Sequence, residues 1–182
     1  MENDIIVEQA ITIASEQGFS HVSHLDVSKL EFLQEVRNMC AADRCRMYDK
    51  SWMCPPGCGE LSDSIERASR YSDGIIVQTT GILTDIFDYE EMQSIGYRHM
   101  DEFRKLRKVL LELCPNLLAL GAGGCKICDE CSYPLSDCRF PDEAIPSMEA
   151  YGLLVSKVCE ENSLGYYYGE GTLTYTSCIL LV

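Results

Sequence analysis

Four cysteines in the second half of the chain have the spacing to bind an inorganic cofactor. Cys125, Cys128 and Cys131 follow one another at every third position, and Cys138 comes later with Pro141 close behind it. Closely spaced thiolates wrap one cluster in bacterial-type iron–sulfur proteins, where a further cysteine near a proline completes the ligands. We therefore predict that these four cysteines, the downstream set, ligate one [4Fe-4S] cluster.

Two details of this run refine the prediction. The gap before Cys138 is longer than in the commonest ferredoxin pattern, and no second copy of the run follows. We therefore expect a cluster in a fold of its own. Gly121, Gly123 and Gly124 allow the backbone to approach a bulky ligand closely. Zinc is the alternative, because four thiolates also hold a structural zinc ion, although zinc sites more often pair two separated Cys-x-x-Cys sequences.

A second group of cysteines lies upstream and consists of Cys40, Cys45, Cys54 and Cys58, the upstream set. Between the last two, the sequence 55–57 is Pro-Pro-Gly, which excludes regular structure and favours a rigid loop. Sets of soft thiolates select iron–sulfur clusters or zinc. We predict a second metal or cluster site here, so that one or two [4Fe-4S] clusters are expected in all. The alternative is that some of these residues are free buried cysteines.

Cysteine usage and the start of the chain indicate a compartment. The chain has 11 cysteines in 182 residues, and Met1 to Ala14 lack the basic and apolar pattern of a secretion signal. An odd number of cysteines without secretion argues against a disulfide framework. No apolar run reaches the length of a membrane span. We expect a cytoplasmic protein whose cysteines bind metal, with no membrane contact.

Length and charge limit the remaining possibilities. A chain of this size with 46% hydrophobic residues can bury one good core, which predicts a single domain over residues 1–182. The formal charge of −14 argues against a nucleic-acid surface, because such a surface needs clustered Lys and Arg. The pattern leaves the oligomeric state open.

The first half of the chain predicts helices and strands in alternation. Residues 4–17 carry an apolar stripe with helical period, and residues 19–27 alternate loosely as in a strand. Ser28 to Glu31 form a capping box for a helix that leads to Cys40. Residues 61–71 predict a further helix. The short, β-branched segment that follows, residues 74–80, predicts a strand.

In the second half, Asp88 can cap the longest helix, with Glu91 three positions later, and Pro115 ends it. A short strand is expected over 117–120, a helix over 147–162, and two strands within 166–181 around a Gly-Glu-Gly turn. Together these elements predict an α+β fold. It would have a mixed sheet of about four to five short strands, about five helices and two cysteine-rich metal-binding loops.

The motifs, taken together, resemble a known family. They are Val36-Arg37 before Cys40 and Cys45, Trp52-Met-Cys-Pro-Pro56, the run from Gly121 to Cys128, Cys138-Arg-Phe-Pro141 and the run from Pro146 to Gly152. From about Asp26 to its end, the chain resembles the small cysteine-rich prokaryotic proteins described as predicted metal-binding proteins, a domain of unknown function. The resemblance implies a metal-binding, iron–sulfur protein of an anaerobic bacterium or archaeon, and it implies no reaction.

Two main function classes remain open. In the first, the protein carries electrons to a redox partner protein. In the second, it is an enzyme in which a cluster with an open iron acts on a small-molecule substrate. The candidate pocket residues are then Arg139, Ser147, Glu149 and the tyrosines around Tyr166. The first is favoured, because the sequence shows ligands and no acid–base set; the histidines, His21, His24 and His99, are scattered. A structural zinc protein is the third possibility.

Overall fold

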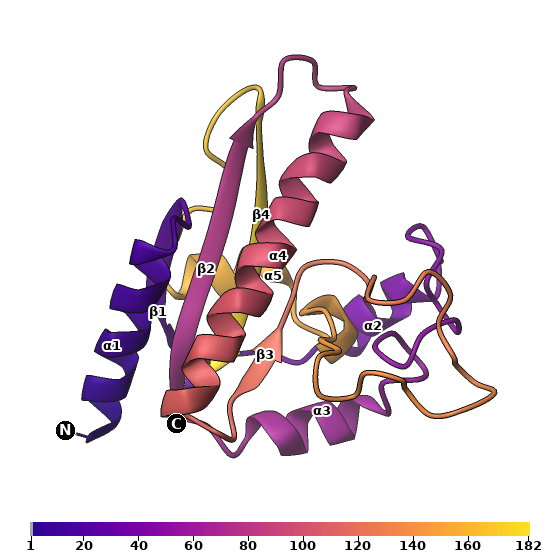
Figure 1. Ribbon diagram of the computed structural model, residues 1–182, viewed down its shortest axis with the longest axis horizontal. Coiled ribbons are helices and arrows are strands. Elements are labelled where there is room, and N and C mark those ends of the chain that lie inside the picture. The colour runs from indigo at the N-terminus through magenta and orange to yellow at the C-terminus, as the bar shows by residue number, and fades with distance from the viewer. Residues whose placement is uncertain (1) are drawn as a thin grey trace.

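The fold is built on one antiparallel sheet of four strands, seen in a computed structural model that describes residues 2–182. The strands are β1 (His21–Asp26), β2 (Asp73–Ile82), β3 (Leu118–Leu120) and β4 (Thr172–Leu180), in the order β1-β2-β4-β3. The long strands β2 and β4 form the centre of the sheet (Figure 1). Every pair of neighbouring strands is antiparallel, whereas the sequence predicted a mixed sheet.

Five α-helices and two short 3-10 helices are present in this part of the chain. The α-helices are α1 (Glu2–Glu16), α2 (Gln34–Cys40), α3 (Leu61–Ala68), α4 (Tyr89–Leu113) and α5 (Val155–Glu161). The 3-10 helices are η1 (Val27–Lys29) and η2 (Glu149–Tyr151). None of these described helices is long and apolar enough to cross a bilayer. The predicted α+β class is thereby confirmed.

The sheet separates two apolar cores, because successive side chains of a strand point to opposite faces. On one face, Ile75 and Val77 of β2 pack with Phe103 of α4 and with the buried side of α1. On the other face, Ile76 packs with Tyr151 of η2 and with residues of α3 and α5. The helices therefore cover both faces of the sheet. α1 and α4, labelled in Figure 1, lie on the first face, and α3 and α5 lie on the second.

Three local predictions fail for identifiable reasons. Ser28 does not cap a helix; instead Asp26 accepts a hydrogen bond from the Ser28 N–H and starts η1, and α2 begins later. The helix expected over 147–162 is interrupted by Gly152, whose φ of 80° ends η2 before α5 begins. The expected hairpin over 166–181 has only its second strand, β4.

Except for Cys40, the cysteines of the predicted ligand sets lie in two segments without helix or strand. The upstream cysteine loop, residues 41–60, joins α2 to α3; the downstream cysteine loop, residues 121–146, joins β3 to η2. In Figure 1 both loops lie together on the right-hand side, beyond the edge of the sheet marked by β3. Cys40 itself is the last residue of α2, as predicted.

His99 of α4 lies inside the core and is fully buried. Its Nδ1 shares a hydrogen bond of 2.9 Å with Thr79 Oγ1, and its Nε2 shares one of 2.7 Å with Ser177 Oγ. A neutral imidazole satisfies both hydroxyls, since one ring nitrogen donates and the other accepts. Burial lowers the pKa of His99 from 6.5 to about 4. The side chain ties α4 to β2 and β4.

This burial predicts a loss of stability in mild acid. As the pH falls from 6.5 towards 4, the unfolded chain binds a proton that the native His99 does not, so the free energy of unfolding falls by up to about 3 kcal/mol. In His99→Gln the difference in stability between pH 7 and pH 5, measured by urea unfolding, should shrink. The exposed His24→Gln is the control. An unchanged pH dependence in His99→Gln would contradict the assignment.

Candidate metal centre

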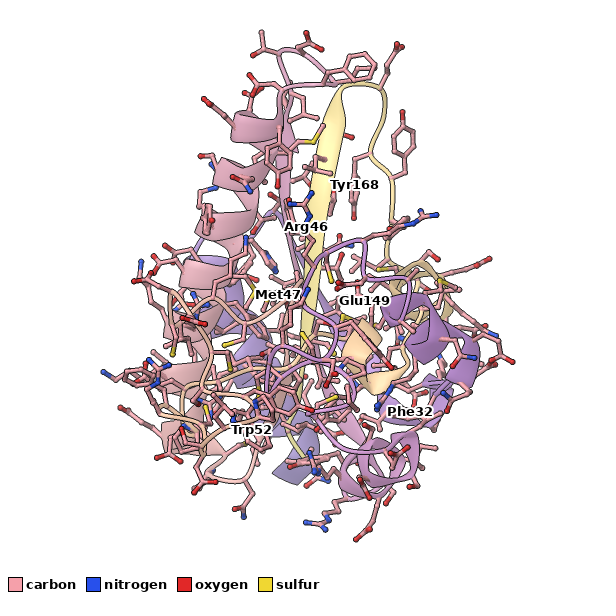
Figure 2. All side chains as sticks on the ribbon, turned by 90° about the vertical axis from the view of Figure 1, so that its right-hand side faces the viewer. Phe32, Arg46, Met47, Trp52, Glu149 and Tyr168 are labelled. Atoms are coloured by element: carbon pink, nitrogen blue, oxygen red, sulfur yellow. The ribbon has the colours of Figure 1, made fainter. Side chains whose placement is uncertain are left out.

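The two cysteine loops are joined through Trp52. Its indole Nε1 donates a 3.0 Å hydrogen bond to the Ser136 carbonyl of the other loop, and its ring meets Tyr133 edge-on with centroids 4.9 Å apart. The Tyr133 hydroxyl in turn donates to Asp49 Oδ1 at 3.0 Å. Figure 2 shows Trp52 and Met47 on the face of the molecule formed by the loops. The loops therefore form one interlocked unit.

The structure brings all four cysteines of the downstream set to one hollow. Cys125, Cys128, Cys131 and Cys138 line it, and residues 51–53 of the upstream loop form its opposite wall. All four thiols are partly buried. The hollow measures ≈ 20 Å³, which is roughly the space of one water molecule. Four cysteines that line one space are the donor set expected of a thiolate metal site.

The surroundings of Cys131 favour a thiolate. Burial opposes its ionisation, but the backbone N–H groups of Tyr133 and Trp52, the Ser51 hydroxyl and the Arg139 guanidinium together lower its pKa below the ordinary value. At Cys131, therefore, both loops contribute groups that stabilise negative charge on sulfur. Metals bind the deprotonated thiol, so these groups also favour a metal–thiolate bond.

Arg139 is anchored beside this thiol. Its Nη2 donates a 2.6 Å hydrogen bond to the Glu130 carbonyl, one residue before Cys131. Arg139 also lines the hollow together with the four cysteines. From the sequence, this arginine was a candidate pocket residue of the enzyme. In the structure its positive charge acts on the Cys131 thiol and lowers the pKa of that thiol.

The upstream set is divided between two cavities. Cys40, Cys45 and Cys54 line a cavity of ≈ 430 Å³. Ser147, just before η2, and Glu149, the first residue of η2, line the same cavity. Cys58 lines a different cavity, and its Sγ lies 3.8 Å from the Ala150 carbonyl. The structure therefore groups three of the four predicted upstream ligands and also brings in two of the candidate pocket residues.

The environment of Cys54 and Cys40 favours the protonated form of both thiols. Burial, followed by the neighbouring thiols of Cys45, Cys58 and Cys40, raises the pKa of Cys54 to about 12. Burial and then the carboxylate of Glu149 raise the pKa of Cys40. A metal at these positions must displace the protons, so its affinity will depend on pH.

A buried cation lies beside this set. Arg37 of α2 is only 6% exposed, and its Nη2 donates a 2.6 Å hydrogen bond to the Gly59 carbonyl. Its Nη1 is buried without a hydrogen-bond partner among residues 2–182. The positive charge of Arg37 favours the ionised forms of Cys40 and Cys58. A buried charge is costly unless it is paired, so an anionic metal–thiolate group at this position fits the observed arrangement.

The other cysteines belong to the cores. Cys114 packs in the core of α1 and α4, and Cys178 of β4 is fully buried on the other face of the sheet. Cys159 of α5 is buried and accepts a 3.5 Å hydrogen bond from Gln78 Nε2.

Tyr166, a candidate pocket residue of the enzyme, is 53% exposed in the segment that leads into β4. Figure 1 places this segment away from the cysteine loops.

Sequence reasoning missed the residues that connect the two sets. Tyr133 and Ser51 were not noted at all, and Trp52 and Arg37 were noted only as parts of motifs. The sequence did contain a clue to the role of Trp52, because it is the single tryptophan and stands two positions before Cys54. Within residues 2–182, no three His, Cys, Asp or Glu side chains are arranged so that they could hold a metal ion as the loops stand. The ligand assignments therefore remain predictions.

Comparison with known proteins adds one finding. A family model described as "Predicted metal-binding protein (DUF2284)" matches residues 23–181. The match includes both cysteine loops and confirms the resemblance drawn from the motifs. No curated protein and no solved structure matches the chain.

The buried charge of Arg37 allows a test of whether the neighbouring thiols bind a metal. In Arg37→Gln the amide can still donate to Gly59, but the buried positive charge is lost. If an anionic metal–thiolate group lies beside it, the metal content should fall and the metal-loaded protein should become less stable, because the group loses its compensating charge. Metal analysis and thermal unfolding measure both effects. Arg46→Gln, an exposed charge change in the upstream cysteine loop, should alter neither. A fully metallated Arg37→Gln protein of unchanged or greater stability would contradict this role.

Proposed function

Because the chain belongs to the family of predicted metal-binding proteins, we propose that its metal is iron in one or two [4Fe-4S] clusters and that it transfers electrons to a redox partner protein. The observation that supports the proposal most strongly is the common hollow of the downstream set, Cys125, Cys128, Cys131 and Cys138. Four thiols from one short loop, with a proline after the last of them, match the ligand pattern of such clusters.

The proposal requires the downstream loop to move. A four-iron cube is larger than a hollow of ≈ 20 Å³, so the four cysteines must separate when it binds. Residues 122–146 belong to no helix or strand and can shift without breaking the sheet. For metal sites in general, binding and local folding are coupled, because the ligands are brought together by the metal.

When bound, a cluster supplies a one-electron redox couple. The chain's own residues would tune it. The N–H groups of Tyr133 and Trp52 point at Cys131, and the guanidinium of Arg139 places a positive charge beside the same sulfur. Hydrogen bonds and positive charge near a ligand sulfur favour the more negative, reduced state. Trp52 also shields the site by packing between the loops.

A second candidate function is an enzyme that acts on a small substrate at the upstream set. One observation favours it: three cysteines, rather than four, line a cavity of ≈ 430 Å³, which is within the range of small-molecule sites. Glu149 and Ser147 lie in the same wall and could bind or protonate a ligand. In this account Cys58 does not act as a ligand. A structural zinc protein is the remaining alternative, since zinc also binds sets of thiolates.

The identity of the metal is tested by analysis of protein purified without oxygen. We expect iron and acid-labile sulfide in equal amounts. Cys128→Ala should lose about half of both if two clusters are present and nearly all if there is one. Cys114→Ala, which changes a buried core cysteine, should keep its full content. Stoichiometric zinc without sulfide would contradict the proposal and support the structural zinc protein.

Arg139 allows the carrier and the enzyme to be distinguished. For a carrier, Arg139→Gln should lower the reduction potential, because a positive charge near Cys131 is lost, while iron content stays unchanged. Spectroscopically monitored redox titration measures this, and Arg70→Gln is the control for net charge. An unchanged potential would contradict the role given to Arg139. A change in the electron paramagnetic resonance signal when a small molecule is added to the reduced protein would favour the enzyme.

A further inference from the structure

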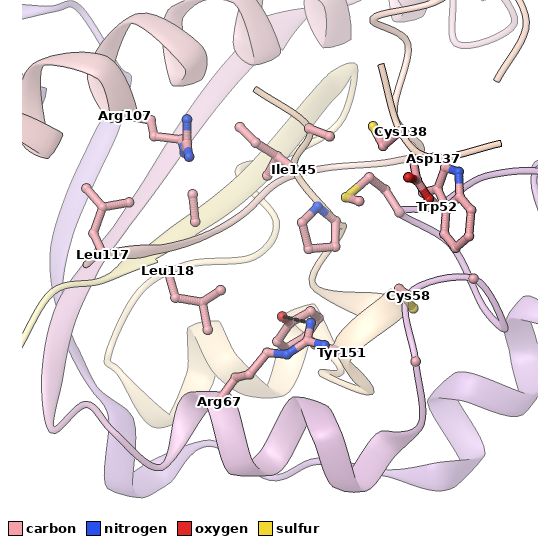
Figure 3. Close-up of a pocket in the computed structure, with 16 residues that line it drawn as sticks. Trp52, Cys58, Arg67, Arg107, Leu117, Leu118, Asp137, Cys138, Ile145 and Tyr151 are labelled. Carbon is pink, nitrogen blue, oxygen red and sulfur yellow. Dashed lines mark hydrogen bonds between the residues drawn. The ribbon is translucent and has the colours of Figure 1, made fainter. Parts of the chain in front are cut away.

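A cavity lies where the two cysteine loops meet the sheet. It measures ≈ 490 Å³, a size typical of small-molecule sites. Figure 3 shows Cys58 and Cys138, one from each ligand set, on one side of this cavity. The cavity therefore borders both sets, and neither the family description nor the proposed function assigns it a ligand.

Two arginines from different helices reach into this cavity. Arg67 of α3 donates from Nη1 to the Tyr151 hydroxyl at 3.3 Å, and Arg107 of α4 donates from Nη1 to the Asp142 carbonyl at 2.8 Å. Each of these bonds uses one nitrogen of a group that has five N–H donors. Both guanidinium groups are thus held in place by the protein and retain donors of the fork geometry that binds carboxylate or phosphate.

The wall between the arginines is apolar. Figure 3 shows Leu118 between Arg107 and Arg67, with Ile145 beside Arg107. The charged residues lining the cavity are the two arginines and Asp137, so its wall has an excess of positive charge. The chain as a whole has a net charge of −14. A local positive site on such an acidic protein will concentrate anions at that site.

We propose that this cavity binds a small organic molecule with two anionic groups, carboxylate or phosphate. One group pairs with Arg67 and the other with Arg107, and the carbon skeleton packs on Leu118. The ligand lies beside Cys58 and Cys138, so it is placed to act as a substrate or as an effector of either set. The site is made by side chains outside the thiol sets, and it does not depend on which metal the thiols bind.

The single tryptophan provides a direct test, because Trp52 also lines the cavity. The protein as isolated should be titrated at constant ionic strength with dicarboxylates from succinate to adipate and with pyrophosphate. Trp52 emission and isothermal calorimetry serve as the two readouts. We expect saturable binding of at least one of these dianions with a dissociation constant of about 1 mM or tighter, and at least about tenfold weaker binding of acetate. Saturation by the dicarboxylates alone or by pyrophosphate alone identifies the anionic group.

Arg67→Gln and Arg107→Gln should each weaken dianion binding by about tenfold or more, because each removes one charge-assisted contact. Arg70→Gln, an exposed charge change beyond the end of α3, should bind as the unchanged protein does. Circular dichroism checks that the variants fold, and the wild-type ligand series decides the question on its own. The proposal would be overturned if no dianion binds saturably. It would also be overturned if Arg67→Gln and Arg107→Gln both bind the dianions as tightly as the unchanged protein does. This proposal and the iron–sulfur proposal can fail independently. Metal analysis measures what the cysteines bind, whereas the dianion titration measures what the arginines bind.

Discussion

The contact between Trp52 and the downstream cysteine loop is the constraint on which the candidate site depends. Neither loop has a ladder of backbone hydrogen bonds to fix its shape, so side chains must hold the cysteines in place. Trp52 does this through its hydrogen bond to Ser136 and its contact with Tyr133. Gly57 permits the close packing, because a Cβ at this position would lie 2.5 Å from the Ser51 carbonyl and 2.9 Å from the Tyr133 ring. The opposite wall of the hollow exists only because these segments meet.

The sheet and its helices determine where the loops begin and end. α2 ends at Cys40, and β3 ends at Leu120, directly before the downstream loop. The loop returns to the sheet through a parallel bridge between Gly121 and Ser147, and the Met148 N–H donates to the Gly121 carbonyl at 3.0 Å. Both ends of the downstream loop are therefore fixed by backbone hydrogen bonds, while its middle is held mainly by side-chain contacts that can rearrange around a metal. A rigid frame with an adaptable loop is the usual arrangement for a binding site.

The sequence predicted the frame well, because long apolar periodic segments dominate it. α1, α4 and the strands appear where hydrophobic spacing placed them, and Asp88 caps α4 by accepting a hydrogen bond from the Glu91 N–H at 2.9 Å. It failed where one backbone angle or one competing cap decides the outcome, as at Gly152 and Asp26. The grouping of the cysteines could be predicted only in part. Cys-x-x-Cys spacing is local, whereas the separation of Cys58 from its set and the insertion of Trp52 are long-range contacts that no local pattern contains.

Anomalous X-ray diffraction at the iron absorption edge, on crystals of protein purified without oxygen, tests the central claim most directly. The account predicts strong iron density bounded by Cys125, Cys128, Cys131 and Cys138, with residues 51–53 of the upstream loop as the opposite wall. The downstream loop should have moved outward relative to the arrangement described above. Absence of iron at this position, or an anomalous signal that appears only at the zinc edge, would contradict the account.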